Sequence, residues 1–445
     1  MKRRAVQGFL VALLSATLAS AQSTAPHPTH GELPSLKLGP DEEPGNSISA
    51  GIMVGASYDD NVLQGQKGRR SDEAYLIRPH FELTHNQSRT HLLLSATPGF
   101  TKYQHIPERD RLTGGAETDL RSLLTEHLEM RFRDTFTRTD DPEFDVFNRP
   151  ATEVGVVDLS PGLIAVPLGK RVSNNSNLEM TYQTSPYGMI DLGGNYHYQH
   201  FSPIPRIIGG NELPVQLINN ETAGARAAYA YRASERHTVG LMYSFQDLAF
   251  YRQTRARTVT DTIFYTHAIA ITPKMSFEVF AGPERAHTFN IIEIGIGIGT
   301  VFLPVNKTSW SWAGGSTFGW QGNHTSFRAS FVRQVGEGGG LLSAVRQQRE
   351  TLEALHQFTQ RWSADVHVSY GENKLLNVFS NAASIRSFVV SVGAKRRITQ
   401  NVSFRLGYTR AQQDRRGRLL GGSEATDRDR VSVSLEYNFK HPLGR

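Results

Sequence analysis

Two adjacent carboxylates and an asparagine are the first residues in the chain with the chemistry of a binding site. Asp59, Asp60 and Asn61 follow Tyr58, directly after the alternating run SISAGIMVGA. Calcium takes six to eight oxygen ligands, and three consecutive residues project in different directions and supply too few. Aspartate and asparagine are also favoured where a strand breaks into a turn. We therefore expect these four residues to form a strand-exit motif, with a loop cation site as the less favoured alternative.

Histidines offer two further possibilities for chemistry. His197 and His200 are three residues apart, and in a strand such positions point to opposite faces, so the pair cannot chelate one ion. His367 and Asp365 are two apart and would share a face, as a coupled acid–base pair requires. No nucleophile motif accompanies them. A barrel hydrolase is therefore a minor alternative, and the sequence assigns no catalytic residue and no metal ligand.

Glycine-rich stretches do not indicate a cofactor. The run GIGIG at 295–299 is not followed by the helix that a dinucleotide-binding loop requires. The run GEGGG at 336–340 lacks the Lys-Ser/Thr of a phosphate-binding loop, and we interpret it as a flexible outer loop. We expect no cofactor.

The elements that must position these residues begin after an export signal. Residues 1–21 combine a basic start, an apolar run and the small-residue ending ASA, which predicts a secretory signal peptide cleaved between Ala21 and Gln22. Residues 22–46 are rich in proline and charge and predict a flexible periplasmic lead-in. The chain has no cysteine, which excludes disulfides and thiolate metal sites. Of the formal charge of +6, three positive charges lie in the signal, and the remaining 6 − 3 = +3 does not favour nucleic acid as a partner.

Strict two-residue alternation is the main structural signal. In RVSVSLEYNF at 430–439, apolar side chains alternate with serine, glutamate and asparagine, so that one face is apolar and the other polar. NVSFRLGYTR at 401–410 and RWSADVHVSY at 361–370 repeat the pattern. No stretch after residue 21 is long and apolar enough for a transmembrane helix.

Short polar turns such as TQR and TQN alternate with long, glycine-rich connections such as 411–430. Eight tight turns, with both chain ends on the tight-turn side, give 2 × 8 + 2 = 18 strands. An even number suits antiparallel closure, and a sheet in lipid must close on itself to pair its backbone groups. We therefore predict that residues 47–445 form an all-β, transmembrane, antiparallel up-and-down β-barrel of about 18 strands, within a range of 16 to 20. A soluble β-sandwich is the alternative, and RQQRETLEALHQF at 346–358 could instead be a helix.

Charged residues on the polar faces are the candidates for a channel lining. They are Arg405, Arg328, Arg131, Arg133, Asp365, Glu278 and Glu436. Opposed charges on a pore wall favour hydrated polar solutes over apolar ones. A general diffusion porin for small polar solutes fits this lining as well as a sugar channel does.

The chain resembles the outer-membrane β-barrel porin-like proteins found beside exopolysaccharide export systems in Gram-negative bacteria. The resemblance spans residues 47–439 and lies in GASYDDNVL at the end of the first strand, the AxA-type signal, the turns and the last strand VSVSLEYNF. Six residues, KHPLGR, follow Phe439, where such chains usually end. The resemblance implies an outer-membrane conduit or accessory component for polysaccharide or oligosaccharide transport. Its implied partners are outer-membrane lipid, lipopolysaccharide and polysaccharide export components.

Overall fold

The computed structural model describes residues 45–63, 69–139, 169–203, 217–251, 255–296, 299–376, 383–416 and 424–443. Within these ranges the chain is almost entirely β-structure, with one short 3₁₀ turn, η2, at Pro107–Arg109. No helix in this part of the chain has the length and apolar character needed to cross a bilayer.

Eighteen strands follow one another in sequence. They are β1 (Ser47–Asp59), β2 (Asp72–Asn86), β3 (Thr90–Tyr103), β4 (Arg111–Leu123), β5 (Leu128–Thr139), β6 (Gly169–Gln183), β7 (Gly188–Pro203), β8 (Asn219–Arg232), β9 (His237–Tyr251), β10 (Arg255–Thr272), β11 (Met275–Ile296), β12 (Gly299–Gln321), β13 (Thr325–Gly338), β14 (Leu342–Gln357), β15 (Trp362–Leu375), β16 (Ser384–Arg397), β17 (Val402–Arg416) and β18 (Glu424–Pro442).

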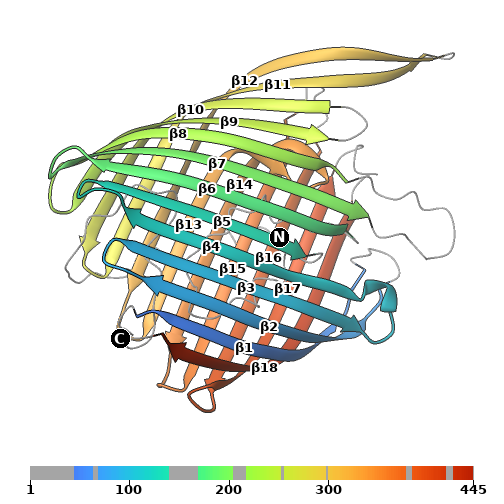
Figure 1. Cartoon of the computed structure of the whole chain (residues 1–445). Coiled ribbons are helices and arrows are strands. Elements are labelled where there is room, and N and C mark those ends of the chain that lie inside the picture. The colour runs from blue at the N-terminus through green and yellow to red at the C-terminus, as the bar shows by residue number, and fades with distance from the viewer. Residues whose placement is uncertain are drawn as a thin grey trace, which may run out of the picture.

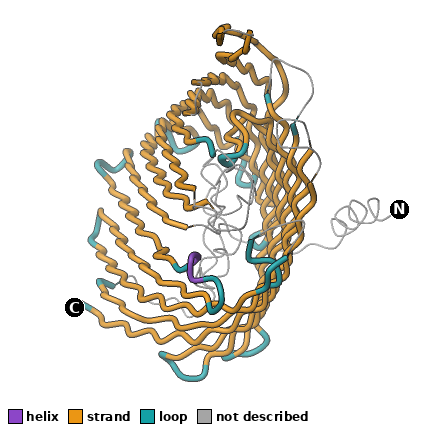
Figure 2. Tube along the Cα trace, turned by 90° about the vertical axis from the view of Figure 1, so that its right-hand side faces the viewer, coloured by secondary structure: helices purple, strands orange, loops and turns teal. Residues whose placement is uncertain are grey.

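Every strand pairs antiparallel with its neighbours in the sequence, and β1 also pairs with β18 along its whole length. The sheet therefore closes into an up-and-down β-barrel of 18 strands, which confirms the predicted fold. In Figure 1 the strands β1 to β8 cross in front of β13 to β17, and the hairpin of the two longest strands, β11 and β12, reaches beyond the rest. Figure 2 shows the strands as one curved wall.

The two faces of the wall differ as the sequence alternation predicts, because successive side chains of a strand point to opposite sides. On β18 the exposed outer side chains are Val431, Val433, Leu435, Tyr437 and Phe439. Serine, glutamate and asparagine occupy the positions between them and point inward. The outer face thus carries a band of apolar and aromatic side chains, which continues through Ile52 and Val54 on β1.

Several strands are longer than the sequence indicated. β18 begins at Glu424, so the whole polar stretch at 424–430 is strand and not loop. At the other end β18 continues past Phe439 to Pro442, and the amide of Leu443 donates to the carbonyl of Asn46 at 2.7 Å.

The proposed helix at 346–358 is wrong, because residues 342–357 form β14. Its neighbours supply backbone pairing that overrides helix propensity.

The connection between β13 and β14 is not an outer loop. Gly339 and Gly340 make a tight turn with φ of 59° and 85°, values that glycine adopts without strain. The amide of Ile218 donates to the carbonyl of Gly340 at 2.8 Å. A Cβ on Gly340 would meet the ring of Phe201 at 2.5 Å, so only glycine fits there. The turn therefore lies inside the barrel, against the start of β8.

The β13–β14 tip forms a second layer on the inner face of β8 to β11. Leu341, Leu342 and Val345 pack with Phe201 of β7, and Ala344 packs with Leu248 and Phe250 of β9. The amide of Val335 donates to Glu284 of β11 at 2.9 Å. These contacts form apolar clusters inside the barrel, near the strand ends that carry the long connections.

Candidate functional site

The strand-exit motif joins the first strand of the barrel to the last. Asp59 is the final residue of β1, and its buried carboxylate accepts a hydrogen bond of 2.7 Å from Nε of the buried Arg428 on β18. The Asn61 amide donates to Oδ1 of Asp59 at 3.0 Å, and the Asn61 side chain donates to the carbonyl of Asp427 at 2.9 Å. The motif thus closes the barrel seam, as a strand exit with a structural role.

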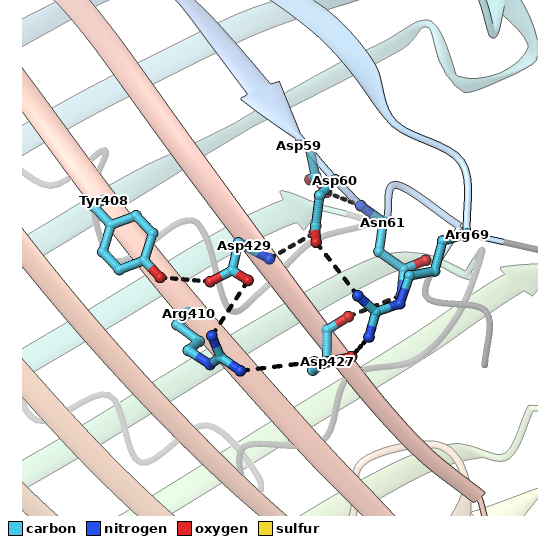
Figure 3. A network of polar contacts seen from close by, with 8 residues as sticks. All are labelled: Asp59, Asp60, Asn61, Arg69, Tyr408, Arg410, Asp427 and Asp429. Carbon is cyan, nitrogen blue, oxygen red and sulfur yellow. Dashed lines mark hydrogen bonds and ion pairs between the residues drawn. The ribbon is translucent and has the colours of Figure 1, made fainter.

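A second, more exposed network lies on the outer side of the same seam (Figure 3). Asp60 accepts from the backbone amide of Asp429 at 2.7 Å. Arg69 pairs with both Asp60 and Asp427, and Arg410 lies between Asp427 and Asp429. Tyr408 donates to Asp429 at 2.5 Å. Tyr58, by contrast, is half exposed on the outer face.

These contacts leave the motif's oxygens engaged by arginine and amide donors. Among the described residues no group of three or more histidine, aspartate or glutamate side chains is arranged to hold a metal ion. Arg428, which completes the buried seam pair, comes from the stretch at 424–430, which the sequence pattern assigned to a loop. The alternation of aspartate and arginine at 427–430 was the sequence feature that could have indicated a strand there.

The charged residues predicted to line the lumen all project from the inner face. Most of them are joined by ion pairs between strands. Asp119 of β4 accepts hydrogen bonds from Arg131 and Arg133 of β5 at 2.7 and 2.8 Å. Lys395 of β16 donates to Glu436 of β18 at 3.1 Å. Arg328 is buried on β13 and lies in register with Glu353 of β14.

Two of the bridges pass over a glycine on the strand between the partners. Arg405 of β17 reaches Asp365 of β15 at 2.8 Å across Gly393 of β16. A Cβ on Gly393 would lie 2.7 Å from both the Arg405 Nη2 and an Asp365 oxygen. The missing side chain is therefore what allows the two charges to meet.

The same arrangement recurs on the other side of the barrel. Arg226 of β8 pairs with Glu179 of β6 across Gly193 of β7, and its Nε also donates to Asp191 at 3.0 Å. A Cβ on Gly193 would lie 2.8 Å from that Nε. Sequence analysis missed both bridges, because the partners are 40 and 47 positions apart and the glycines look like ordinary strand residues.

Glu278 is different from the other predicted lumen residues. Within the described chain its carboxylate has no hydrogen bond or ion pair, and it lies on β11 between Ala268 of β10 and Thr317 of β12. Phe264 and Phe280 make an edge contact nearby, with ring centroids 5.3 Å apart.

The histidine pairs do not form catalytic or metal-binding units. His367 lies 3.3 Å from Glu353, while the carboxylate of Asp365 is engaged by Arg405, so the acid–base pair considered from sequence is not formed. His197 lies on the inner face, 3.5 Å from Glu337, whereas His200 stacks on Tyr198 of the outer face. The two rings thus lie on opposite faces, as their spacing predicts.

Comparison with known proteins gives structural likeness without sequence likeness. No family model matches the chain, and no curated protein sequence matches it. The FrpB iron transporter from Neisseria meningitidis (F5-1 variant) aligns with a TM-score of 0.42 and 9% identity, over 89% of this chain and 83% of that chain.

Two further solved structures give similar values. OccK2 (OpdF) of Pseudomonas aeruginosa aligns with a TM-score of 0.42 and 10% identity, over 88% of this chain and 98% of that chain. The ferric citrate transporter FecA in its unliganded form aligns with a TM-score of 0.43 and 8% identity, over 88% and 78%. TM-scores and identities this low do not support assigning the function of these proteins to this chain. The proposed function therefore rests on the chain's own residues.

Proposed function

We propose that the protein is an outer-membrane channel for hydrated polar solutes. The observation that carries this proposal is the two-faced wall: an apolar and aromatic band outside, and bridged charges with hydroxyl side chains inside. A closed sheet leaves no unpaired edge in lipid, and bacterial barrels of this kind carry an apolar outer band between aromatic girdles. Barrels of 16 to 18 strands are wide enough to hold an aqueous channel.

The orientation and route to the membrane follow from the same proposal. The signal peptide at residues 1–21 would direct export, and the tight turns with both chain ends would face the periplasm. The outer seam network beyond Tyr408 would then lie at the level of lipid and lipopolysaccharide headgroups.

For the solute, we propose carbohydrate, as oligosaccharide or exopolysaccharide, with polysaccharide export components as partners. Most of the lumen charges are held in ion pairs, such as Arg405 with Asp365 and Lys395 with Glu436. Paired charges create a local field that polar hydroxyls tolerate, without the strong selectivity of a single-sign lining. A general diffusion porin for small polar solutes is the competing proposal.

Reconstitution in planar bilayers tests the channel. The folded, signal-cleaved protein should give stepwise ion currents that are absent from bilayers treated with heat-unfolded protein. Folded, inserted protein without current would overturn the proposal.

The solute class is tested in the same bilayers. A carbohydrate channel should show current block by neutral and acidic oligosaccharides but not by small anions. A channel that no oligosaccharide blocks, and that passes small sugars, amino acids and anions by size alone, would favour the diffusion porin.

A further inference from the structure

Asp134 carries a carboxylate on the outer face of the barrel, among apolar side chains of its own strand. Asp134 points outward from β5, with Leu128, Met130 and Phe132 between it and the tight turn, and Phe136 beyond it. Because a spanning strand has about 9 to 11 residues, this carboxylate lies near the middle of the apolar band. On β17 and β18 the comparable outward positions are leucine and valine.

Only one of the two carboxylate oxygens of Asp134 has hydrogen-bond partners among the described residues of its own chain. Its Oδ1 accepts hydrogen bonds from Ser176 at 2.5 Å and Asn174 at 3.1 Å, both on β6. Within the described residues, Oδ2 has no hydrogen-bond partner. Thr118, which faces Asp134 in register from β4, likewise makes no side-chain hydrogen bond there. An acceptor and a donor are thus left side by side on a surface where lipid offers neither.

The β4–β5 pair is also complementary to itself in shape. In register across the two strands, small Ala116 faces bulky Phe136, and Gly114 faces Arg138. A two-fold axis that runs along the barrel axis and passes between β4 and β5 places β4 of one copy against β5 of the other. Each Phe136 then meets Ala116 of its partner, and each Asp134 Oδ2 meets the Thr118 hydroxyl. Such a contact uses one patch twice, as two-fold dimers do.

We propose that the protein forms a two-fold homodimer in the membrane through β4 and β5, with Asp134 accepting a hydrogen bond from Thr118 of the second copy. The proposal rests on the membrane location proposed above but not on transport. A monomeric protein that still conducts would therefore overturn the dimer and leave the channel intact.

The absence of cysteine makes a direct test clean. Two full-length chains with different tags, one carrying Thr118→Cys and the other Asp134→Cys, are expressed together and oxidised in the membrane. We expect a disulfide that joins the two tags in up to about half of the molecules, the share of mixed dimers that random pairing of two equally expressed chains gives. The matched control is Leu406→Cys with Val433→Cys, which are also outward and in register on neighbouring strands. No tag-joining disulfide above the level of this control would overturn the proposal.

Sedimentation in density-matched detergent gives a second readout that needs no cysteine. The natural protein should sediment as a dimer. The Asp134→Leu variant should sediment as a monomer, with half the measured protein mass. Gel mobility before and after heating checks that this variant is folded. Natural protein that sediments as a monomer at every detergent ratio would contradict the proposal. An Asp134→Leu variant that remains dimeric would contradict it as well.

Discussion

The inner face of β9 and β10 differs from the inner face of the strands that carry the bridged charges. On β9 and β10 the inward residues are uncharged, mostly threonine and apolar side chains, and Thr258, Leu248 and Phe250 are 1 to 2% exposed. The side chains of Arg405 and Arg226, in contrast, each keep 16% of their surface exposed. Both faces follow the same two-residue alternation.

The difference is explained by what covers each wall. The β13–β14 tip packs on β8 to β11, so their inner residues lie between two layers of protein. Charge would be costly in such a place, since a buried ion loses its hydration. The bridged charges of Arg226 and Arg405 lie outside the contacts made by the tip, and their side chains remain partly exposed. The charge that does lie under the tip, the carboxylate of Glu284, is 3% exposed and accepts hydrogen bonds from the Val335 amide and the Ser311 hydroxyl in place of water.

The sharpest exception is the seam, where an ion pair on the charged side is as buried as a core residue. Asp59→Ala leaves the guanidinium of Arg428 buried without its carboxylate. We expect the free energy of unfolding to fall by about 3 to 5 kcal/mol, measured by urea unfolding in lipid vesicles. Replacing both partners, with Asp59→Asn and Arg428→Gln, should cost less than the single change, because no charge is then stranded. Equal losses would show that the seam behaves as an exposed pair.

On the covered wall the corresponding test is a cavity. Leu248→Ala should lower the free energy of unfolding by about 3 kcal/mol, since the space between β9 and Ala344 cannot collapse fully. Leu241→Ala, on the outer face of the same strand and 61% exposed, is the control and should cost less because no cavity forms. If the two losses are equal, the β13–β14 tip does not cover this wall in solution.

Much of this fold could be predicted from the sequence because alternation and turn chemistry are local. The two-residue alternation and the count of tight turns predict the strand number and the closure of the barrel. The alternation also predicts that Arg131 and Arg405 point inward. The inward turn at Gly339 and Gly340 could not be predicted, because glycines favour an outer loop and a buried turn equally. Whether a wall is covered depends on contacts such as Phe201 with Leu342, whose partners lie far apart in the chain.

The glycine bridges allow a test within the charged wall. Gly393→Ala places a Cβ within 2.7 Å of Arg405 and Asp365, so the guanidinium must shift. We expect a loss of about 1 to 3 kcal/mol in the free energy of unfolding, as for other overpacked sites. In the Arg405→Ala background the same change should be nearly neutral, because Asp365 is no longer held by the guanidinium and can turn away from the added Cβ. A loss that persists in that background would place the strain in the backbone and not in the bridge.

The smallest effect on stability should accompany the clearest effect on the channel. Asp365→Asn and Asp247→Asn each remove the carboxylate partner of one arginine, Arg405 on the inner face and Arg257 on the outer face. Each should change the free energy of unfolding by about 1 kcal/mol or less, as partly exposed pairs do. Only Asp365→Asn leaves an unpaired positive charge on the lumen side, so only this variant should shift the reversal potential toward anion preference in a salt gradient. The same shift in both variants would mean that ions sense the outer rim, and that the paired charges of the inner wall do not line the conducting path.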